Sequence, residues 1–544
     1  MPVPRRVYFF ANGRADGRTS MRDRLGGKGA NLADMTRAGL PVPPGFTLPA
    51  DQCAAYHAAG RLPDGLADDV RKAVARLQKI TGRRFGDPVN PLLVSVRSGA
   101  GVSMPGMMET VLNVGLNASI VAALADAGRG RFAYDSYRRL IAMYATAVDG
   151  VDGLGFEDLM RAARAHFDVD DDRHLDENAM RLIADEAVAL YERETGHAFP
   201  QDPFDQLLHA TEAVFKSWTG RRAVRYRDIN HITGLPGTAV TVQAMVFGNS
   251  GNDSATGVAF TRDPSTGRRG FFGEFVINAL GEDLVGGVRT PLNCRKHFPK
   301  WDRRLWAELQ TVRDTLEQRY RDVQDFEFTI EHGVLYLLQT RTAQRTAAAA
   351  VKIAVDMVAE GLIDERTAVS RVDAEMISRL RPAVFDPKQR PAPLADGLAA
   401  SPGAAVGRIA FTAAEAEARA AAGEAIILVR PETYPDDIGG FHAARGVLTS
   451  TGGMTSHAAV VARGMNRTCV VGVKAMKIDE AARRLTIKMV RRTHTFGPDD
   501  TLSIDGTVGH VYAGAVPTIP AKPNGPLRTL LKWKAMNDAT ARTD

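Results

Sequence analysis

The sequence contains few cysteines and no long apolar run. Its three cysteines, Cys53, Cys294 and Cys469, are far apart, which excludes a disulfide framework and a CxxC metal site and favours a reducing compartment. No uncharged apolar stretch reaches the roughly 18 residues that a membrane-spanning helix needs. The N-terminal apolar run has four residues, which is too short for a signal peptide. We therefore expect a cytoplasmic protein without a membrane span.

A strong excess of one charge is also absent. The chain has 69 Lys and Arg against 63 Asp and Glu, which gives a net charge of +6. This excess suits a protein that handles phosphates but is too small to predict a nucleic-acid partner. Hydrophobic residues make up 44% and charged residues 24%, as in ordinary soluble proteins, and 544 residues are too many for one compact core. We expect two to four domains.

Changes in hydrophobic spacing predict the domain organisation. Residues 119–228 have helical spacing, whereas residues 237–341 contain strand-like runs separated by Gly, Asn and Asp. A proline cluster within residues 387–405 is typical of a linker. The predicted order is a first domain over 1–345 with a helical insertion at about 119–228, a helical linker over 346–393, a compact α/β domain over 394–515 and a tail over 516–544.

The first domain contains three short motifs that suit phosphate binding. GGKG (26–29) opens a predicted helix, where backbone N–H groups attract phosphate and Lys28 adds a positive charge. VSVRSG places Arg97 at a strand end, and SMPGMMET contains Gly106 between methionines. The Walker sequence GxxxxGK[ST] is absent. The alternatives are a tight turn with a surface lysine and a flexible loop packed by methionine.

The segment QDFEFTIEHGVLYLLQTR (324–341) predicts a hairpin with polar ends. Asp325 and Glu327 lie on the same side of one strand, and Gln339 and Arg341 lie at the end of the other. Oxygen ligands of this kind suit Mg²⁺, which binds through one or two carboxylates together with nucleotide phosphates. The alternative is the polar face of an edge hairpin. Elsewhere, the acidic pair in LGEDLVGG is expected to be solvated when taken alone.

A single histidine, His457, follows a Gly-Gly turn in TSTGGMTSHAAVVARGM (449–465). A zinc site needs several nearby Cys or His residues, and Cys469 and His442 fit no such spacing. A serine hydrolase would need a motif such as GxSxG, which is missing. Two interpretations remain: a packed histidine at a helix start, and a nucleophile toward phosphorus.

Several residues close to His457 in the sequence suit the binding of a phosphoryl group. Gly452 and Gly453 allow a phosphoryl donor to approach closely, and free N–H groups at a helix start stabilise an anion. Thr455 is the expected N-cap residue, and Arg463 is expected to pair with phosphate.

Taken together, these motifs resemble the pyruvate phosphate dikinase family, almost colinearly from about residue 8 to 515. The related water dikinase and rifampicin phosphotransferase families share the histidine domain but usually differ around the histidine. The matching segments are LGGKGANLADM, PLLVSVRSGA, SMPGMMET, RFAYDSYRR, TAVTVQAMVFGN, TGVAFTRDPSTG, INALGED, GVRTP, LYLLQTR, ASPGAA, GGMTSHAAVVARGM and IDGTVG.

The resemblance implies an α/β and α+β multidomain fold, with an ATP-grasp nucleotide-binding domain followed by a swivelling phosphohistidine β/β/α domain. It implies that ATP and inorganic phosphate phosphorylate His457, giving AMP and pyrophosphate, with Mg²⁺ as cofactor and pyruvate as the final acceptor. Thr455 matches a residue phosphorylated for regulation in plant relatives. Arg341 would be catalytic, Glu327 and Gln339 would hold the metal, and the nucleotide and phosphates would contact Lys28, Arg97, Gly106, Thr256, Gly257, Glu282, Asp283, Asp325, Glu327 and Gln339.

The sequence departs from the family in two places. Gly101 and Val102 replace an Arg-Ala pair, which removes one positive charge near the phosphate loop. The family's (β/α)₈ barrel, which binds pyruvate or phosphoenolpyruvate, is expected to begin near residue 545. We therefore expect partial reactions, with the barrel supplied by a separate chain. The alternatives are transfer to another acceptor and a non-catalytic remnant that binds nucleotide.

Overall fold

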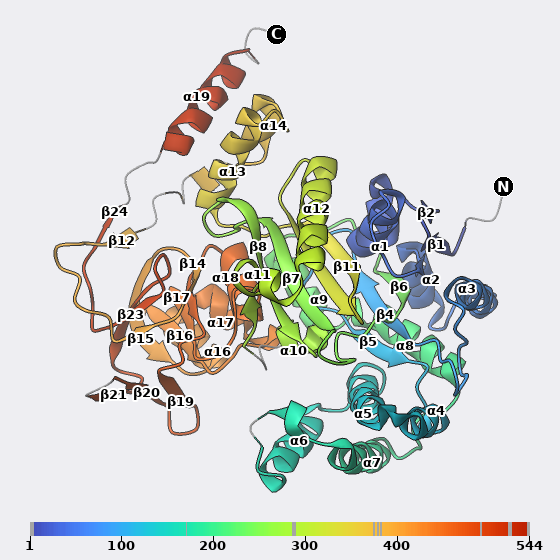
Figure 1. The fold of residues 1–544 in the computed structure, drawn as a ribbon. Helices are drawn as coiled ribbons and strands as arrows, with labels where there is room; N and C mark the ends of the chain where they lie inside the picture. The colour runs from blue at the N-terminus through green and yellow to red at the C-terminus, as the bar shows by residue number, and fades with distance from the viewer. Residues whose placement is uncertain are drawn as a thin grey trace. The chain divides into compact units, whose positions relative to one another are not determined.

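The computed structural model describes most of the chain and divides it into two compact units (Figure 1). The first unit comprises Met1–Ser250 and Tyr336–Arg341, and the second comprises Gly251–Leu335 and Thr342–Asp544. Among the described residues, no helix combines the length and apolar character that a membrane span requires. The described residues are 5–169, 171–285, 290–373, 376–377, 380, 383–489, 492–520 and 525–540.

The first unit is built on a six-stranded sheet with the strand order β2-β1-β3-β6-β4-β5. Two neighbouring inner strands, β4 and β6, consist entirely of buried residues, although their sequences VSVRSG and AVTVQA include the polar residues Arg97 and Gln243. Three helices precede β4 in the chain: α1 (Arg22–Arg37), α2 (Ala50–Ala59) and α3 (Leu66–Thr81). The strands are β1 (Tyr8–Ala11), β2 (Arg14–Ala15), β3 (Gly45–Leu48), β4 (Val94–Gly99), β5 (Thr110–Val114) and β6 (Ala239–Ala244).

A helical region separates β5 from β6, in the segment where helical spacing predicts helices. Short polar side chains begin several of these helices: Asn117, Asp176 and Asp202 each accept a hydrogen bond from a backbone N–H of the first turn. The helices are α4 (Ala118–Leu124), α5 (Gly130–Ala147), α6 (Leu154–His166), α7 (Glu177–Thr195), α8 (Pro203–Ser217) and α9 (Arg221–Ile229).

The second unit begins with strands of a five-stranded sheet in the order β11-β10-β7-β8-β9. Most of strand β11, residues Tyr336–Arg341, is grouped with the first unit, and the rest of this strand belongs to the second unit. The strands are β7 (Ala255–Arg262), β8 (Arg269–Ile277), β9 (Leu292–Asn293), β10 (Gln324–Glu331) and β11 (Val334–Thr342), and the helices between them are α10 (Gly281–Val285), α11 (Cys294–Trp301) and α12 (Arg303–Tyr320).

The alanine-rich segment after β11, at the start of the predicted helical linker 346–393, forms two separate helices. Helix α13 (Ala347–Ala359) ends before Gly361, whose φ of 72° is the left-handed conformation that stops a helix. The side chain of Asp364 then accepts a hydrogen bond from Thr367 N and starts α14 (Glu365–Ser370). Both helices contact α19 (Gly525–Thr540), and β12 (Ala383–Phe385) pairs with β24 (Thr518–Pro520).

An eight-stranded sheet forms the centre of the region that contains His457, with the order β13-β23-β22-β15-β16-β17-β18-β14. Helices α16 (Ala413–Ala421), α17 (Ile438–Ala443) and α18 (His457–Gly464) contact its parallel strands (Figure 1). The strands are β13 (Ala395–Asp396), β14 (Leu398–Ser401), β15 (Ala404–Ala410), β16 (Ile426–Arg430), β17 (Gly446–Thr449), β18 (Thr468–Val471), β22 (Thr501–Asp505) and β23 (His510–Ala513).

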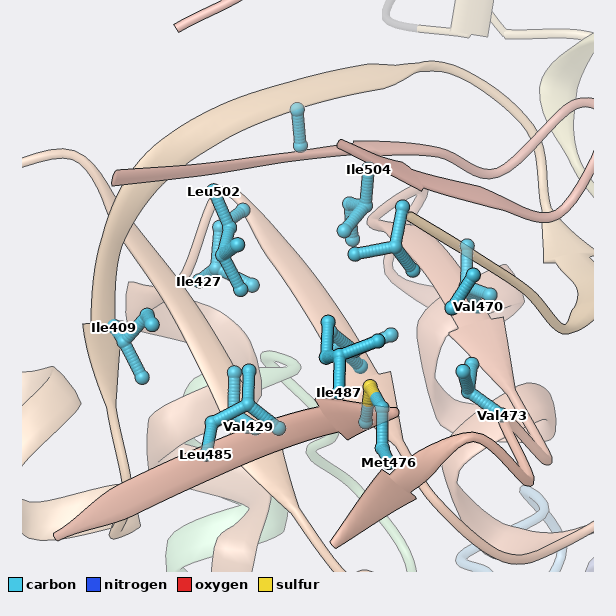
Figure 2. Packing of buried hydrophobic residues seen from close by; sticks show 14 of the residues in the cluster. Ile409, Ile427, Val429, Val470, Val473, Met476, Leu485, Ile487, Leu502 and Ile504 are labelled. Carbon is cyan, nitrogen blue, oxygen red and sulfur yellow. The ribbon is translucent and has the colours of Figure 1, made fainter. Parts of the chain in front are cut away.

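A three-stranded sheet completes the hydrophobic core of this region. Its strands are β19 (Met476–Asp479), β20 (Arg484–Lys488) and β21 (Thr493–Phe496). Figure 2 shows Leu485 and Ile487 of β20 packed with Ile427, Val429 and Leu502 of the larger sheet, and all five are fully buried. The α/β and α+β multidomain class is thereby confirmed. The domain boundaries at residues 345, 393 and 515 stay predictions.

Candidate functional site

The Gly-rich loop lies at a kink within α1, where Gly26 has non-helical backbone angles, and it packs closely on Gly99, the last residue of β4. Gly26 has a φ of 68°, and a Cβ atom at this position would lie 1.9 Å from the Gly99 carbonyl oxygen. The N–H of Gly27 donates a hydrogen bond to the Ala100 carbonyl at 2.7 Å. Half-buried Lys28 follows directly. Glycine is therefore required at position 26, both for its backbone conformation and for the space it leaves.

Replacing Gly26 with alanine is expected to destabilise the first unit and to displace the loop that carries Lys28. A left-handed alanine costs about 1–3 kcal/mol, and here the added methyl group also meets the Gly99 carbonyl. Gly39→Ala is the matched control, because Gly39 has a φ of 76° but no atom within 4 Å of the added Cβ. Thermal unfolding measures both. Equal losses in the two variants would show that the contact with Gly99 is unimportant.

The structure places Lys28, Arg97, Gln339 and Arg341 in the same unit. Arg97 is 8% exposed, donates a hydrogen bond to the Leu338 carbonyl at 3.1 Å, and also bonds to the side chain of Gln243. The side-chain amide of Asn31 donates to the Thr340 carbonyl at 2.7 Å. These bonds hold the end of β11, which carries Gln339 and Arg341, against β4 and α1.

Gly106 lies in the loop between β4 and β5. It is exposed, with a φ of 69°, whereas Met104 and Met107 on either side are buried. The methionines anchor the loop and leave the glycine at the surface. Val102, which replaces the usual alanine, is 43% exposed, and Gly101 is buried, with its carbonyl bound to Arg22 Nε.

Three of the residues predicted in the second unit share one face of the sheet. In the antiparallel pair β7–β10, Glu327 lies opposite Val258 and Thr329 lies opposite Thr256. Because directly opposed residues point to the same face, Thr256 lies on the same face as Asp325 and Glu327. Thr256 and Asp325 are buried and Glu327 is half-buried.

Gly257 lies on the other face of β7 and has a packing role. A Cβ atom there would come within 2.2 Å of the Phe328 ring, so only glycine fits. The acidic pair in α10 is less solvated than expected. Glu282 is half-buried and Asp283 is buried, and the Asp283 carboxylate accepts a hydrogen bond from Leu280 N at 3.0 Å.

No metal cluster made by protein groups alone accompanies the predicted magnesium ligands. Within the part of the chain that the structure describes, no group of three or more His, Cys, Asp and Glu residues is arranged to hold a metal ion. Magnesium commonly takes one or two protein oxygens and fills its other positions with water and phosphate oxygens. The assignment of Glu327 and Gln339 as magnesium ligands therefore stays a prediction.

His457 is the first residue of α18 and has two distinct ring nitrogens. Its Nδ1 lies 3.2 Å from the Thr433 hydroxyl, and its ring packs edge-on against Phe441. Among the described residues, the buried Nε2 has no hydrogen-bond partner. Burial lowers the pKa of His457 to about 4, because the charged imidazolium is poorly solvated there. The ring is therefore neutral at physiological pH.

The structure corrects the predicted roles of two neighbours of His457. The N-cap position belongs to Ser456, and the Thr455 hydroxyl instead donates to the Glu274 carboxylate at 3.1 Å. Arg463 is 1% exposed and donates to the carbonyls of Ala400 at 3.1 Å and Met454 at 2.8 Å. Arg463 thus fixes the loop before α18 and is not exposed to pair with a phosphate.

Glu274 on β8 contacts the loop before α18, and the sequence did not predict this contact. Burial raises the pKa of this carboxyl. Hydrogen bonds from the backbone N–H groups of Met454 and Thr455 and from the Thr455 hydroxyl act in the opposite direction, but burial has the larger effect. A Cβ atom on Gly453 would lie 2.5 Å from Glu274 Oε2, so the second glycine of the Gly-Gly turn makes room for this carboxylate. An acidic residue within the apolar run FFGEFVI was the available signal.

Thr433 was also missed, because it lies 24 residues before His457 in sequence. It follows strand β16 in the segment RPETYP, at the carboxyl end of a parallel strand, where site residues of α/β sheets gather.

The GVRTP motif falls partly on residues 286–289, which lie outside the described residues.

Comparison with known proteins identifies the family. The family described as "Pyruvate phosphate dikinase, AMP/ATP-binding domain" matches residues 22–79, 58–306 and 299–362, and "PEP-utilising enzyme, mobile domain" matches residues 423–509. "Pyruvate, phosphate dikinase" of Rhizobium meliloti (strain 1021) is 48% identical over 552 residues, which cover 99% of this chain and 61% of the relative. That of Clostridium symbiosum is 47% identical over 535 residues, covering 97% of this chain and 60% of the relative.

A plant protein, "Pyruvate, phosphate dikinase 1, chloroplastic" of Oryza sativa subsp. japonica, is 46% identical over 541 residues, which cover 98% of this chain and 56% of the relative. The chain thus spans between 56% and 61% of the length of these three relatives. Matches to the two family descriptions follow the chain in the order nucleotide-binding region, then mobile region. The chain belongs to the pyruvate, phosphate dikinase family.

Proposed function

We propose that this chain transfers the β-phosphoryl group of ATP to His457. The observation that carries the proposal is the geometry of His457: a neutral ring at a helix start, with Nδ1 against Thr433 and Nε2 buried without a hydrogen-bond partner among the described residues. The Thr433 hydroxyl orients the ring and leaves the Nε2 lone pair as the nucleophile. The free N–H groups at the start of α18 stabilise the phosphoryl anion.

The proposed reaction has two steps. Nε2 attacks the β-phosphorus of ATP, the bond to the α-phosphate oxygen breaks, and AMP leaves while His457 carries a pyrophosphoryl group. Inorganic phosphate then attacks the distal phosphorus, pyrophosphate leaves, and His457 retains one phosphoryl group. Atoms and charge balance without an oxidant or reductant.

We propose that the residues assigned to the nucleotide by the family resemblance bind ATP. In the first unit, the N–H groups of the Gly-rich loop, Lys28, Arg97 and Gln339 hold the phosphates, Gly106 lies in the loop over them, and Arg341 neutralises the charge that develops during transfer. In the second unit, Thr256, Gly257, Glu282, Asp283, Asp325 and Glu327 contribute. Mg²⁺ held by Glu327 and Gln339 would shield phosphate charge and align the reacting oxygens.

The final acceptor is proposed to be pyruvate, which would give phosphoenolpyruvate. This part of the proposal rests on the names of the relatives, of whose length this chain spans only part. We place pyruvate binding outside residues 1–544, on a barrel that belongs to a further part of the protein or to a separate chain. Phosphorylated His457 must then move away from the nucleotide to reach pyruvate. We propose that rotation of the swivelling domain produces this movement.

Thr455 remains the proposed site of regulatory phosphorylation. In this structure its hydroxyl is buried and donates to Glu274, so a modifying enzyme would require this contact to open first. We infer that Thr455 is protected while the loop contacts Glu274 and accessible when the loop is released.

The products of a single turnover test the proposed reaction. The chain mixed with ATP, Mg²⁺ and inorganic phosphate should form one equivalent each of AMP and pyrophosphate per chain. Without inorganic phosphate, AMP should still form while free pyrophosphate should not. Formation of ADP as the nucleotide product would refute the proposal.

The lowered pKa of His457 predicts a pH dependence. The folded pKa of about 4 lies below the ordinary value of 6.5, so the native state binds fewer protons than the unfolded state between these values. The contribution of His457 to stability is therefore fully present above pH 6.5 and is lost as the pH falls toward 4. Phosphorylation should correspondingly persist at pH 5.5, where an ordinary histidine is mostly charged. NMR titration of the His457 ring measures this directly, and a midpoint near 6.5 would contradict the structure.

A further inference from the structure

An open pocket of about 410 Å³ in the second unit lies outside all the residues assigned above. It is formed by the turn between β7 and β8, the first residues of β8, and the junction of β9 with α11. Four of its lining residues are basic: Arg268, Arg269, Arg295 and Lys296. A pocket of this size is in the range that holds a small molecule.

The positive charge of the pocket is poorly neutralised by the protein. All four basic residues are exposed, and within the described residues the side chains of Arg268, Arg295 and Lys296 form no ion pair. Arg269 lies 3.8 Å from Glu360, which Arg262 also binds, so this carboxylate is shared. Several like charges around a concave surface raise the local concentration of anions.

The acidic residue in the lining, Asp263, is occupied by the turn. Its carboxylate accepts hydrogen bonds from Ser265 N at 2.8 Å, Thr266 N at 3.2 Å and the Thr266 hydroxyl at 2.7 Å. These bonds shape the turn that presents Arg268, and they direct the carboxylate toward the turn's own donors. Among the described residues Asp263 forms no ion pair with these cations, and they outnumber this one carboxylate in the lining.

The lining also supplies an apolar surface. Phe272 on β8 is half-buried and forms part of the wall, and buried Phe271 beside it packs against Trp306 at a ring-centroid distance of 4.9 Å. These rings hold the base of the pocket rigid, while the cations lie on longer side chains. A rigid wall with several converging cations suits a compact polyanion better than an extended acidic peptide.

We propose that this pocket is a second anion site, which binds a small ligand carrying two or more phosphate charges. The pocket shares no residue with the proposed nucleotide residues or with the contacts of His457, so the proposal does not depend on the catalytic proposal. A ligand held there lies on β8, the same strand that presents Glu274 to the His457 loop, which gives it a route to influence that contact.

Calorimetry with inorganic pyrophosphate as the probe tests the proposal. Wild-type chain should bind two pyrophosphate ions, and the triple variant Arg268→Ala, Arg295→Ala, Lys296→Ala should bind one. The Lys28→Ala variant should still bind pyrophosphate in the pocket. Adding the three substitutions to Lys28→Ala should weaken the affinity for this pyrophosphate about tenfold or more. Arg484→Ala is the matched control, because Arg484 is exposed and, among the described residues, in no ion pair.

The outcomes separate the two proposals. If the triple variant binds pyrophosphate as wild type does, or if wild type binds none, the second anion site is overturned. Binding that the triple change removes but that Lys28→Ala leaves unaltered supports the pocket and argues against Lys28 as a phosphate ligand. Binding to an acidic peptide that competes with pyrophosphate at higher affinity would overturn the small-ligand assignment.

Discussion

Replacing His457 with asparagine should abolish acid-labile labelling of the chain by [β-³²P]ATP. Asparagine keeps a polar side chain at the start of α18 but has no nitrogen lone pair that can attack phosphorus. We expect labelling to fall below detection, a loss of at least about 10³-fold, since the nucleophile itself is removed. The nucleotide residues are unchanged, so ATP should bind to the variant with wild-type affinity.

Thr433→Val is the informative companion variant. It removes the hydroxyl beside Nδ1 and keeps a branched side chain of similar size, so labelling should slow by about 10- to 100-fold while Nε2 remains the site of attachment. The label should survive base and be released by acid. Persistent labelling in His457→Asn would show that another residue is the acceptor.

Replacing Arg262 with methionine should produce the largest loss of stability. Arg262 on β7 is fully buried and bonds to two carboxylates, Glu317 of α12 at 2.6 Å and Glu360 after α13 at 2.7 Å. Burial opposes the charge, but these bonds outweigh it and raise the pKa of Arg262. Methionine would leave the two carboxylates without their buried cation, and only exposed Arg269 would remain near Glu360, at a cost of about 3–5 kcal/mol.

Arg269→Met is the matched control for this prediction. Arg269 lies on the neighbouring strand β8 and approaches the same Glu360, but its side chain is 68% exposed and 3.8 Å away. An exposed pair of this kind contributes about 0–1 kcal/mol. Urea unfolding should therefore separate the two variants clearly. If Arg262→Met is no less stable than Arg269→Met, the buried ion pairs do not hold β7, α12 and α13 together.

Local sequence patterns predicted helices and strands well where burial alone determines the pattern of residue types. The strand-like runs VSVRSG and AVTVQA became the buried strands β4 and β6, in which valine and alanine alternate with polar residues that are buried as well, such as Arg97 and Gln243. The break between α13 and α14 was missed, because alanine-rich periodicity continues past Gly361 and a single left-handed glycine stops the helix.

Side-chain roles near His457 were harder to predict because they depend on partners distant in sequence. Thr455 has the residue type of an N-cap, yet Glu274, 181 residues earlier, accepts its hydroxyl hydrogen bond. Arg463 has the charge to bind phosphate, yet burial and two main-chain carbonyls occupy it. Glu274 and Ala400 leave no local signal at the histidine motif, whereas Met454 lies within it. Residue type and charge alone therefore assigned these two roles incorrectly.

The fate of each ATP phosphate tests the central claim most directly. Parallel reactions with [β-³²P]ATP and [γ-³²P]ATP, each with Mg²⁺ and inorganic phosphate, should be followed by tryptic digestion under alkaline conditions and peptide mapping. The account predicts that β-label is retained on the peptide containing His457 and that γ-label is released as pyrophosphate. Retention of γ-label on the protein after phosphate is added, or β-label on a peptide without His457, would contradict it.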